Sequence, residues 1–544
     1  MSERERQIKD PIYGYVYLPD KYVQGVIDTP EFQRLRKISQ TSYEALYPAA
    51  THNRFAHSLG VFHLGSIVAK TIREQSLDSF GLSDSQKAKY DEYLEVYRLA
   101  CLLHDVGHAP FSHTSEDFYL KQDKGREPLH EKIAELTGDA RFMAEVSCAA
   151  AHELMSVIVA LKLFGDVIGN GEKKSFFARA ITGYVYKLKP DEGLKPNADG
   201  VSYSFLNALV LLLNSKVIDV DRLDYLIRDS FQTGYESINI DYARLLGAVR
   251  IKKTDAGYKR VFSKDALSVL ENAVYAHDAE KKWIQTHLAI CYETFLLQNA
   301  IKSLLSNDDF KDADVFGEQS ISAEGVELPR GYKIRLMADG DISFLLKNYE
   351  NEFSQEYFNR KIRKHPLWKT EHEYRQHFRE SGWTKFFESL AKYEGSATLM
   401  QVNDSMLRCC EKDVADRESA LSKATAAQQE ECQSRLRNAQ KMFKRVKALK
   451  DFAEELRIPF DFVILTREPF KSSFDKAEFG ALPIEIKDSE NTVPFSEATD
   501  VLSRAGHTAQ TADNVTYYLF SKRSEDVSPS EAISKLKNHL GCLI

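Results

Sequence analysis

The sequence predicts a mainly α protein, in which a large helical core is followed by a smaller mixed α/β lobe at the C-terminal end. Gly and Pro are sparse between about residues 30 and 305, where apolar residues recur at helical spacing. Residues 404–457 are rich in Ala, Gln, Glu, Lys and Arg and lack Gly and Pro, which predicts long solvated helices. Three short segments after residue 459 are enriched in β-branched and aromatic residues, which is typical of strands.

The N-terminal part begins with a predicted strand and then becomes helical. Residues 13–18, YGYVYL, alternate in the manner of a short strand. Thr29 followed by Pro30 is typical of a helix start, with an N-cap residue and a proline in the first turn. Apolar periodicity then predicts the core helices in the segments 57–74, 92–104, 143–165, 204–230 and 264–305.

Changes in composition divide the chain into four predicted segments. The helical core covers residues 1–305, and a connecting or mixed subdomain covers 306–403, because residues 306–345 shift to Asp, Ser and Gly. Long charged helices are predicted over 404–458. The small α/β lobe covers 459–544 and contains the predicted strands 460–465, 482–486 and 515–520.

Composition and charge exclude several classes of protein. The 544 residues include 73 basic and 80 acidic side chains, so the net charge of -7 provides no global positive field for nucleic acid or membrane. The N-terminus, MSERERQIKD, lacks the apolar run of a signal peptide, and the longest apolar stretch, Phe205 to Leu213, is too short to span a bilayer. Seven cysteines without metal-site spacing favour reduced thiols. We therefore expect a cytoplasmic protein without a membrane partner.

Histidines are concentrated in one part of the predicted core. Eight of the fifteen lie between residues 52 and 152, where even scattering would place about three: His52, His57, His63, His104, His108, His113, His130 and His152. A single histidine is more often structural than functional, because imidazole is a versatile hydrogen-bonding group. The grouping is therefore the observation that points to a site.

Two imidazoles and two carboxylates in this region predict a metal centre. His104 and Asp105 follow the apolar segment YRLACLL, so both would emerge from the end of a buried helix, where an unpaired carboxylate is costly. His57 would add an imidazole from an earlier helix and Asp221 a carboxylate from a later one. Such a donor set suits one divalent ion per active site, such as Mn, Mg, Fe, Ni, Co or Zn.

The spacing of neighbouring polar residues places several of them on shared helical faces. The sets with three- or four-residue spacing are Arg54 with His57, His104 with His108, His113 with Glu116, and Asp221 with Tyr225 and Asp229. Each set would point a metal ligand or a substrate contact into one cleft. The last set has an alternative interpretation, because DRLDYLIRD is also typical of an amphipathic helix with a solvated acidic face.

The order of six motifs resembles that of the HD-superfamily deoxynucleoside triphosphate (dNTP) triphosphohydrolases, especially vertebrate members that join a SAM domain to an HD domain and, more loosely, bacterial dGTPases. The motifs are DPIYG, IDTPEFQRLR, THNRFAHSLGV, LLHDVGHAPFSH, HELMS and IDVDRLDYLIRD, within residues 7 to 305. The resemblance implies that the helical core is an HD domain. It also implies the same four metal ligands, His57, His104, Asp105 and Asp221.

The resemblance further implies roles for the residues around the metal. His113 and Glu116 would form the proton-handling pair, with the carboxylate orienting the imidazole. The groups that would face the triphosphate are His108, His152, Arg54 and Arg222, and those that would face the deoxyribose are Gln40, Tyr225 and Asp229. Water would attack the α-phosphorus and release the deoxynucleoside and intact inorganic triphosphate, with His113 as the general acid at the leaving 5′ oxygen.

Three stretches depart from the pattern of the vertebrate members. Arg222 stands where those members have lysine, and the two side chains are not equivalent at a phosphate. The segment QTSYEALYP (40–48) is one residue shorter and lacks a glycine run, which changes the predicted pocket below the sugar. The helix VYAHDAEKKWIQTH (274–287) lacks the expected basic and tyrosine pattern, although His287 matches a histidine there.

The resemblance also implies regulation through an oligomer. Asp28 and Arg36 match positions that bind an activating nucleotide at a subunit interface, so we expect a homo-oligomer, a dimer or a tetramer, with a nucleotide effector. An alternative interpretation is that Asp28 starts a helix and Arg36 covers its surface.

Two other functions compete with dNTP hydrolysis, for which dNTP pool control and defence against phage are both compatible roles. An HD phosphodiesterase or nucleotidase is disfavoured, because the dinuclear phosphodiesterases carry lysine where His108 stands. A nucleotide-sensing or nucleic-acid-binding scaffold would use a local basic stretch to bind single strands, unless that stretch is a solvated helix face. Its residues are Arg435, Arg437, Lys441, Lys444, Arg445, Lys447 and Lys450.

Overall fold

The computed structural model divides the chain into two compact units. The first comprises Met1–Ser354 and Ser472–His507, and the second comprises Gln355–Lys471 and Thr508–Ile544. The structure describes residues 4–120, 125–144, 149–235, 239–310, 314–328, 331–393, 395, 398–469, 476–486, 492–504 and 515–544. The described residues are mainly helical, as the sequence predicts.

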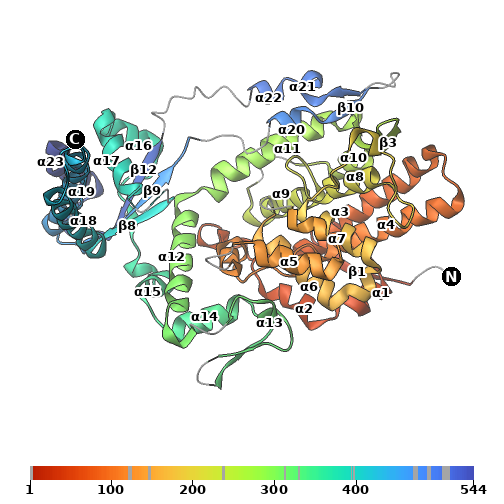
Figure 1. The fold of residues 1–544 in the computed structure, drawn as a ribbon, viewed down its shortest axis with the longest axis horizontal. Helices are drawn as coiled ribbons and strands as arrows, with labels where there is room; N and C mark the ends of the chain where they lie inside the picture. Colours follow the sequence, from red (N-terminus) through yellow and green to blue (C-terminus); the bar gives the residue numbers. More distant parts are fainter. Residues whose placement is uncertain are drawn as a thin grey trace. The chain divides into compact units, whose positions relative to one another are not determined.

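The first unit is a helical core with a small hairpin at its N-terminal end (Figure 1). The hairpin pairs β1 (Glu5–Asp10) with β2 (Gly14–Pro19), which agrees with the predicted strand 13–18. The Thr29 side chain accepts a hydrogen bond from the Phe32 amide and caps α2, with Pro30 in the first turn as expected. The helices up to the next strands are α1 (Asp20–Tyr22), α2 (Pro30–Gln33), α3 (Arg54–Gln75), α4 (Asp84–Leu103), α5 (Glu127–Thr137), α6 (Ala151–Ile168), α7 (Gly171–Thr182), α8 (Tyr203–Leu213), α9 (Val220–Thr233) and α10 (Tyr242–Gly247).

Two helices and several short elements complete the first unit after residue 264. The predicted segment 264–305 forms two helices, α11 and α12, because a π-helical turn over Lys281–Gln285 and the N-cap His287 interrupt it. The bounds are α11 (Leu267–Glu280), α12 (Leu288–Leu305), α13 (Glu318–Ile321), β5 (Val326–Glu327), β6 (Lys333–Ile334) and α14 (Asp339–Asn348), and α15 (Glu352–Phe358) leads into the second unit.

A four-stranded sheet in the first unit differs from the predicted organisation. The strand β10 (Pro483–Glu485) lies in the predicted segment 482–486, but it pairs in parallel with β4 (Gly257–Ser263) and not with the other C-terminal strands. The sheet order is β11-β10-β4-β3, with β3 (Val249–Thr254) and β11 (Thr492–Pro494) at the edges. Figure 1 shows the accompanying helices α20 (Lys476–Gly480), α21 (Phe495–Ala498) and α22 (Val501–Arg504) next to α11. The α/β lobe predicted over 459–544 is therefore split between the two units.

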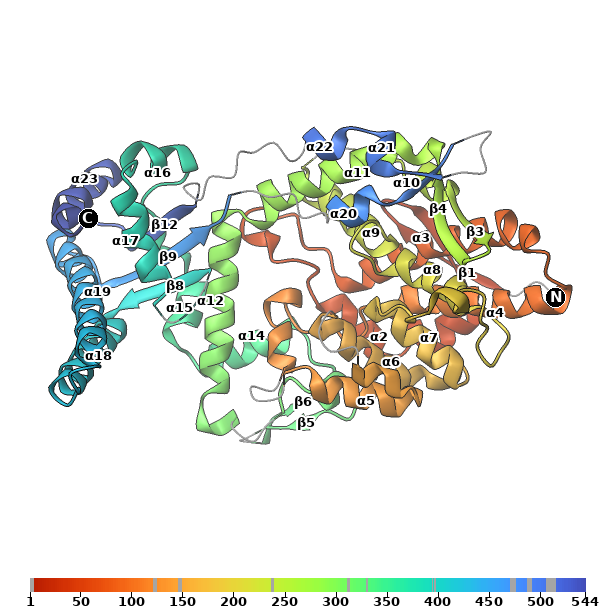
Figure 2. The same ribbon diagram turned by 45° about the horizontal axis from the view of Figure 1, so that its top comes forward.

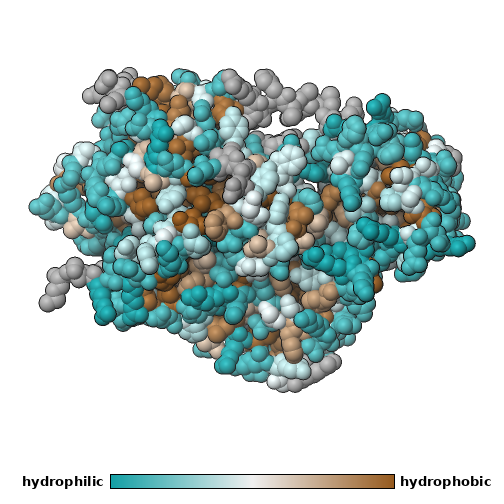
Figure 3. Space-filling model, turned by 180° about the vertical axis from the view of Figure 1, so that it is seen from behind, coloured by the Kyte–Doolittle hydropathy of each residue, from teal (hydrophilic) through white to brown (hydrophobic). Residues whose placement is uncertain are grey.

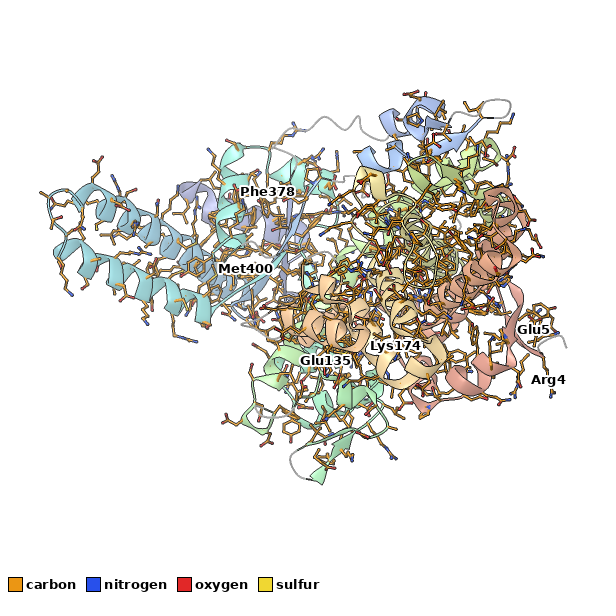
Figure 4. All side chains as sticks on the ribbon, turned by 45° about the vertical axis from the view of Figure 1, so that its right-hand side comes forward. Arg4, Glu5, Glu135, Lys174, Phe378 and Met400 are labelled. Atoms are coloured by element: carbon orange, nitrogen blue, oxygen red, sulfur yellow. The ribbon has the colours of Figure 1, made fainter. Side chains whose placement is uncertain are left out.

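The second unit is built on a four-stranded antiparallel sheet with helices around it. The strand order is β7-β12-β9-β8, and β9 and β12 match the predicted strands 460–465 and 515–520. Phe378 and Met400, which Figure 4 labels in this unit, are buried. The elements are β7 (His365–Pro366), α16 (Glu371–His377), α17 (Ser381–Ala391), β8 (Leu399–Asn403), α18 (Asp404–Ser422), α19 (Gln429–Leu456), β9 (Asp461–Arg467), β12 (Thr516–Ser521) and α23 (Pro529–Leu540).

The predicted long helices over 404–458 are α18 and α19, which lie side by side as an antiparallel hairpin (Figure 2). The basic stretch of α19 is mixed in character. Arg445 is buried, where it donates to the Lys385 carbonyl and the Ser389 hydroxyl and packs on Phe386. Ion pairs hold the first and last cations of the stretch, Arg435 and Lys450. The exposed members are Arg435, Arg437, Lys441, Lys444 and Lys447.

The described surface is predominantly polar. On the face seen in Figure 3, hydrophilic residues predominate and hydrophobic residues are scattered among them. No helix of the described ranges combines the length and the apolar character that a membrane crossing requires. The cysteines whose side chains are described carry free thiols, as expected: Cys101, Cys291, Cys409, Cys410 and Cys432.

Helix α3 packs closely against α9 at Gly60. A Cβ atom placed on Gly60 of α3 would lie 1.9 Å from Oδ1 of Asp224 and 2.5 Å from Nη2 of Arg228, both on α9. Asp224 and Arg228 form a buried ion pair, with Nε 2.9 Å from Oδ2. Glycine at position 60 is therefore a steric requirement for this pair to lie against α3.

We predict that Gly60→Ala lowers the free energy of unfolding by about 3 kcal/mol, because the methyl group overpacks the junction and displaces the buried pair. Thermal and urea unfolding would measure the change. Gly340→Ala is the matched control, because Gly340 is also helical and a Cβ there meets nothing within 4 Å. The control should change the stability by less than about 1 kcal/mol. Equal effects of the two substitutions would contradict the steric argument.

Candidate metal centre and active site

Helix ends deliver the four predicted metal ligands. Asn53 caps α3 by accepting a hydrogen bond from the Ala56 amide, which places His57 in the first turn. Asp219 caps α9 in the same way through the Arg222 amide, so Asp221 lies in the first turn of that helix. His104 is the C-cap of α4, and Asp105 follows it, as the sequence predicts.

The donor atoms of these four side chains converge on one point. Nε2 of His57 lies 2.9 Å from Oδ1 of Asp221 and 3.2 Å from Nε2 of His104. Oδ2 of Asp105 lies 3.5 Å from the same atom of His104 and 3.7 Å from that of His57. Ligand bonds of about 2.1 Å separate neighbouring donors of a tetrahedral or octahedral ion by roughly 3–3.5 Å. The spacing and the chemistry of the donor set both fit a divalent metal ion.

Each imidazole of this group is oriented through its other nitrogen. Nδ1 of His57 donates to Oδ2 of Asp224 at 2.7 Å, and Nδ1 of His104 donates to the carbonyl of Cys101 at 3.0 Å. Both bonds leave Nε2 directed at the convergence point, which is the arrangement that metal-binding histidines require. Burial works to lower the pKa of His57, but its hydrogen bonds to Asp221 and Asp224 outweigh this and raise the pKa to about 10.

Asp224 belongs to a buried network that sequence reasoning missed. Its carboxylate accepts hydrogen bonds from the Tyr13 hydroxyl at 2.7 Å and from Arg228, which also contacts Asp10 at 3.1 Å. The spacing of Asp224 and Arg228 from Asp221 on one helix is a signal that could have suggested the network. Nothing in the sequence pointed to Tyr13, which lies 211 positions away from Asp224.

A second cluster lies beside the first and contains three imidazoles. His108 and His152 stack with ring centroids 4.3 Å apart, and His113 meets each of them at an angle. Glu116 contacts Nδ1 of both His113, at 3.5 Å, and His152. The predicted pair of His113 and Glu116 is therefore part of a triad in which one carboxylate serves two imidazoles.

The pKa values of His108 and His152 are shifted in opposite directions. Burial, with the nearby charge of Arg54, lowers the pKa of His108 well below its usual value, so this ring is neutral. Burial would also lower the pKa of His152, but the hydrogen bond and charge of Glu116 raise it above the ordinary value. The two imidazoles that contact Glu116 hold the pKa of its carboxyl low despite burial. The raised pKa favours the charged form of His152, which is suited to binding an anion.

The loop that carries His104 and His108 is held by Arg34 and by α6. Arg34 is buried and donates to the carbonyls of Val106 and His108, at 2.9 and 3.0 Å. The Gly107 amide donates to the Ser156 hydroxyl at 3.0 Å, and a Cβ at position 107 would lie 2.4 Å from the Ser156 nitrogen. The loop therefore packs directly on α6, which carries His152.

Arg54 lies between the two clusters. Its guanidinium donates to Oδ2 of Asp105 at 2.7 Å and to the Ser112 hydroxyl at 2.8 Å, and it lies 3.4 Å from Nε2 of His113. The side chain is buried but reaches the wall of a cleft. A cation thus separates the metal-binding donors from the exposed imidazole of His113.

Both clusters open into one cleft of about 460 Å³, a size typical of small-molecule sites. It lies within the first unit. Many of the predicted site residues line it: Gln40, Arg54, Asp105, His113, His152, Asp221, Tyr225 and Asp229.

One end of the cleft is a buried polar pocket. Oδ1 of Asp229 lies 2.7 Å from Nε2 of His52, and Glu280 accepts hydrogen bonds from the Tyr43 hydroxyl at 3.3 Å and from Gln285 at 2.9 Å. Burial, followed by the charge of Asp229, raises the pKa of Glu280 well above its ordinary value and so favours the protonated form of its carboxyl. Glu280 and Gln285 lie in the stretch 274–287 that departs from the family pattern, and sequence reasoning did not single them out.

Two predicted residues, Arg222 and His108, lie elsewhere than expected. The Arg222 guanidinium donates to the carbonyls of Val217 and Ser215 and does not line the cleft. His108 is buried beneath His152 rather than exposed to the cleft. Asp28 and Arg36 are exposed, and Arg36 packs on the Phe55 ring and donates to Gln33. Thr29, and not Asp28, caps the following helix.

Comparison with known proteins agrees with this arrangement. Residues 54–163 match the HD domain family, and this range contains the His104–Asp105 pair and both histidine clusters. The chain carries an HD domain. The expectation that its helical core is of the HD superfamily is confirmed.

Several relatives match beyond the HD domain itself. An uncharacterized protein of Mycoplasma genitalium is 27% identical over 311 residues, which cover 56% of this chain and 62% of that protein. The deoxynucleoside triphosphate triphosphohydrolase SAMHD1 of Danio rerio is 30% identical over 48% of this chain and 39% of its own length. The uncharacterized protein YwfO of Bacillus subtilis is 30% identical, over 45% and 44% respectively. The chain therefore spans less than two thirds of each of these relatives.

Two solved structures share the fold over nearly the whole chain. A hypothetical protein from Aquifex aeolicus has a TM-score of 0.54 at 18% identity and covers 98% of this chain and 100% of its own. A phosphohydrolase from Bacteroides thetaiotaomicron has a TM-score of 0.53 at 20% identity and covers 95% and 100%. The fold around the HD domain is therefore shared as well.

We predict that Asp224→Asn lowers the affinity of the HD domain for Mn²⁺ about 10- to 100-fold, because His57 loses the carboxylate that orients its ring. Chelator competition with metal analysis would measure the affinity. Asp139→Asn is the matched control, since Asp139 is also buried and paired with arginines, Arg141 and Arg179, but contacts no histidine. If both variants bind the ion as the unchanged protein does, the orienting role of Asp224 is wrong.

Proposed function

We propose that this protein is a metal-dependent dNTP triphosphohydrolase that releases a deoxynucleoside and inorganic triphosphate. The observation that carries the proposal is that the four metal-binding donors and the triad of Glu116, His113 and His152 meet at one cleft. The names of two relatives support a dNTP as the substrate. SAMHD1 of Danio rerio and the SAMHD1 homolog of Dictyostelium discoideum are both deoxynucleoside triphosphate triphosphohydrolases.

The side chains around the metal site would bind and orient the triphosphate. A bound divalent ion supplies Lewis acidity to a phosphate oxygen and lowers the pKa of water. Arg54 lines the cleft with its guanidinium, whose planar donors suit phosphate oxygens. His152, charged through Glu116, contributes a second cation on the neighbouring wall. Arg222 takes no part in this scheme, because its guanidinium is bound to backbone carbonyls.

His113 would protonate the leaving 5′ oxygen of the deoxynucleoside. Its Nδ1 lies 3.5 Å from Glu116, which orients the ring, and its side chain is 64% exposed toward solvent and the cleft. Imidazole exchanges protons near neutral pH, which suits a general acid. Glu116 is the positioning residue of this pair.

The polar end of the cleft would take the sugar and base. Asp229, Tyr225 and Gln40 line the cleft, as does Glu280, whose raised pKa favours a protonated carboxyl that can donate a hydrogen bond. A buried site of fixed donors and acceptors discriminates strongly between ligands that do and do not match it. This end is therefore the expected source of selectivity for the nucleoside.

The proposal also covers the location, oligomeric state, regulation and cellular role of the protein. We expect a cytoplasmic homo-oligomer, a dimer or tetramer, activated by a nucleotide near Asp28 and Arg36, that serves dNTP pool control or antiviral defence against phage. The exposed positions of Asp28 and Arg36 are compatible with an interface role. The exposed cations of α19 leave single-stranded nucleic acid as a further possible partner.

We predict that the pure protein with Mn²⁺ or Mg²⁺ releases inorganic triphosphate from at least one dNTP, offered singly or in pairs to include an activator. Anion-exchange chromatography would separate triphosphate from pyrophosphate and phosphate. Asp221→Asn should abolish the release, because it removes one of the four converging donors. Release of pyrophosphate or phosphate alone would contradict the proposal and favour a nucleotidase or phosphodiesterase.

We predict that His113→Ala lowers kcat about 10²- to 10⁴-fold while metal content is unchanged, because general acid catalysis is lost and no converging donor is removed. Steady-state rates and metal analysis would measure both quantities. His372→Ala, which removes an exposed histidine of α16, is the control and should keep full activity. Near-normal turnover of His113→Ala would exclude this role, and a large loss in His152→Ala alone would transfer it to His152.

A further inference from the structure

The second unit contains a pocket of its own, which the proposed reaction does not use. Its volume is about 450 Å³, and it lies at the end of the sheet where β7 pairs with β12. All of its lining residues belong to the second unit. The pocket is therefore separate from the catalytic cleft, which lies wholly in the first unit.

Cations gather around this pocket although the protein as a whole is acidic. Its lining includes the cations Lys369, Lys522 and Arg523, and the imidazole of His365 lines the same pocket. Lys369 and Arg523 are exposed at the rim, and neither is ion-paired with a carboxylate anywhere in the described ranges. Burial and then the charges of Arg523 and Lys369 lower the pKa of His365, which places both cations close to that ring.

The carboxylates nearby are already engaged. Glu373 accepts hydrogen bonds from the amides of Lys369 and Thr370, where it completes the cap of α16. Glu356 and Asp461 both bind the buried Lys364, at 2.8 and 2.5 Å. Lys522 shares Glu356 at a longer distance of 3.7 Å, so it is only partly neutralised. Among the lining residues, the three cations Lys369, Lys522 and Arg523 still outnumber the one carboxylate, Glu373.

Two polar features of the wall suit an anion. Ser521 is 2% exposed and lines the pocket, yet its hydroxyl makes no hydrogen bond with any described residue. At the pocket wall this hydroxyl can donate a hydrogen bond to a ligand oxygen. The 12-residue helix α23 also begins at the pocket, with Pro529 and Ala532 in the wall, and its N-terminal end attracts negative charge.

The remaining wall is apolar, and the volume exceeds what an inorganic ion fills. Leu367, Leu456 and Val527 line it together with one edge of the buried Trp368. A concave site with an apolar wall and a few convergent polar groups is typical of small organic ligands. We propose that this pocket binds an organic phosphate of nucleotide size, with its phosphates at Lys369, Arg523 and Ser521 and its organic part against the apolar wall.

The test uses the full-length protein and ATP as the probe, with EDTA present so that no metal supports turnover in the cleft. Calorimetry would measure the Kd, and photo-crosslinking with 8-azido-ATP followed by peptide mapping would locate the label. We expect label in peptides containing residues 365–369 or 521–529. The double charge reversal Lys369→Glu with Arg523→Glu should raise the Kd for ATP at least about 10-fold.

The matched control is Arg408→Glu with Lys412→Glu on α18, which changes the net charge equally in the same unit and leaves the pocket unchanged. This variant should bind ATP as the unchanged protein does. Inorganic triphosphate should bind more weakly than ATP, because it leaves the apolar wall empty. The proposal is overturned if both double variants lose affinity equally, if the label lies only in cleft peptides, or if inorganic triphosphate binds as tightly as ATP.

Discussion

The buried carboxylate of Asp224 is the interaction on which the rest of the site depends. It is fully buried and accepts hydrogen bonds from His57 of α3, from Arg228 of its own helix and from Tyr13 beside the N-terminal hairpin. An unpaired charge at this depth would cost several kcal/mol, so the three segments must stay together for the charge to be compensated. The same bond directs His57 toward the other donors, and Gly60 provides the space. The contacts that stabilise the fold at Asp224 are therefore the same contacts that set the geometry of the candidate metal site.

A second constraint is the short chain segment that joins the two clusters. The loop after α4 carries His104 and Asp105 toward one cluster and His108 and His113 toward the other. Arg54 contacts both groups, because it donates to Asp105 and lies against His113. A cation in this position keeps the carboxylate ionised and holds the exposed imidazole apart from the metal-binding donors. The cleft thus brings the converging His and Asp donors and the imidazoles of His113 and His152 into one small volume.

Local patterns predicted much of the helical core and the donors of the candidate site. The predicted apolar-periodic segments overlap α3, α4, α6, α8, α9, α11 and α12, because a helix that buries one face repeats apolar residues at helical spacing. The segments 204–230 and 264–305 each contain two helices, and α4 and α6 begin eight residues before and after the starts of their segments, respectively. His57, His104, Asp105 and Asp221 were predicted from residue type and from their places near helix ends, and the structure brings their donor atoms within 3.7 Å of His57. Their role as metal ligands remains a proposal.

The sequence by itself determined which segments are helices and strands and which residue types the site would contain, because these depend on interactions within a few residues. Only the tertiary structure decided which distant groups meet. Strand propensity predicted β10, but its pairing with β4 depends on the path of the chain back to the first unit. Arg222 and Arg228 lie on one helix, and nothing local shows that one binds carbonyls while the other compensates Asp224. The difference arises because buried charges are compensated by groups that are distant in the sequence, and a short sequence pattern does not show which groups meet.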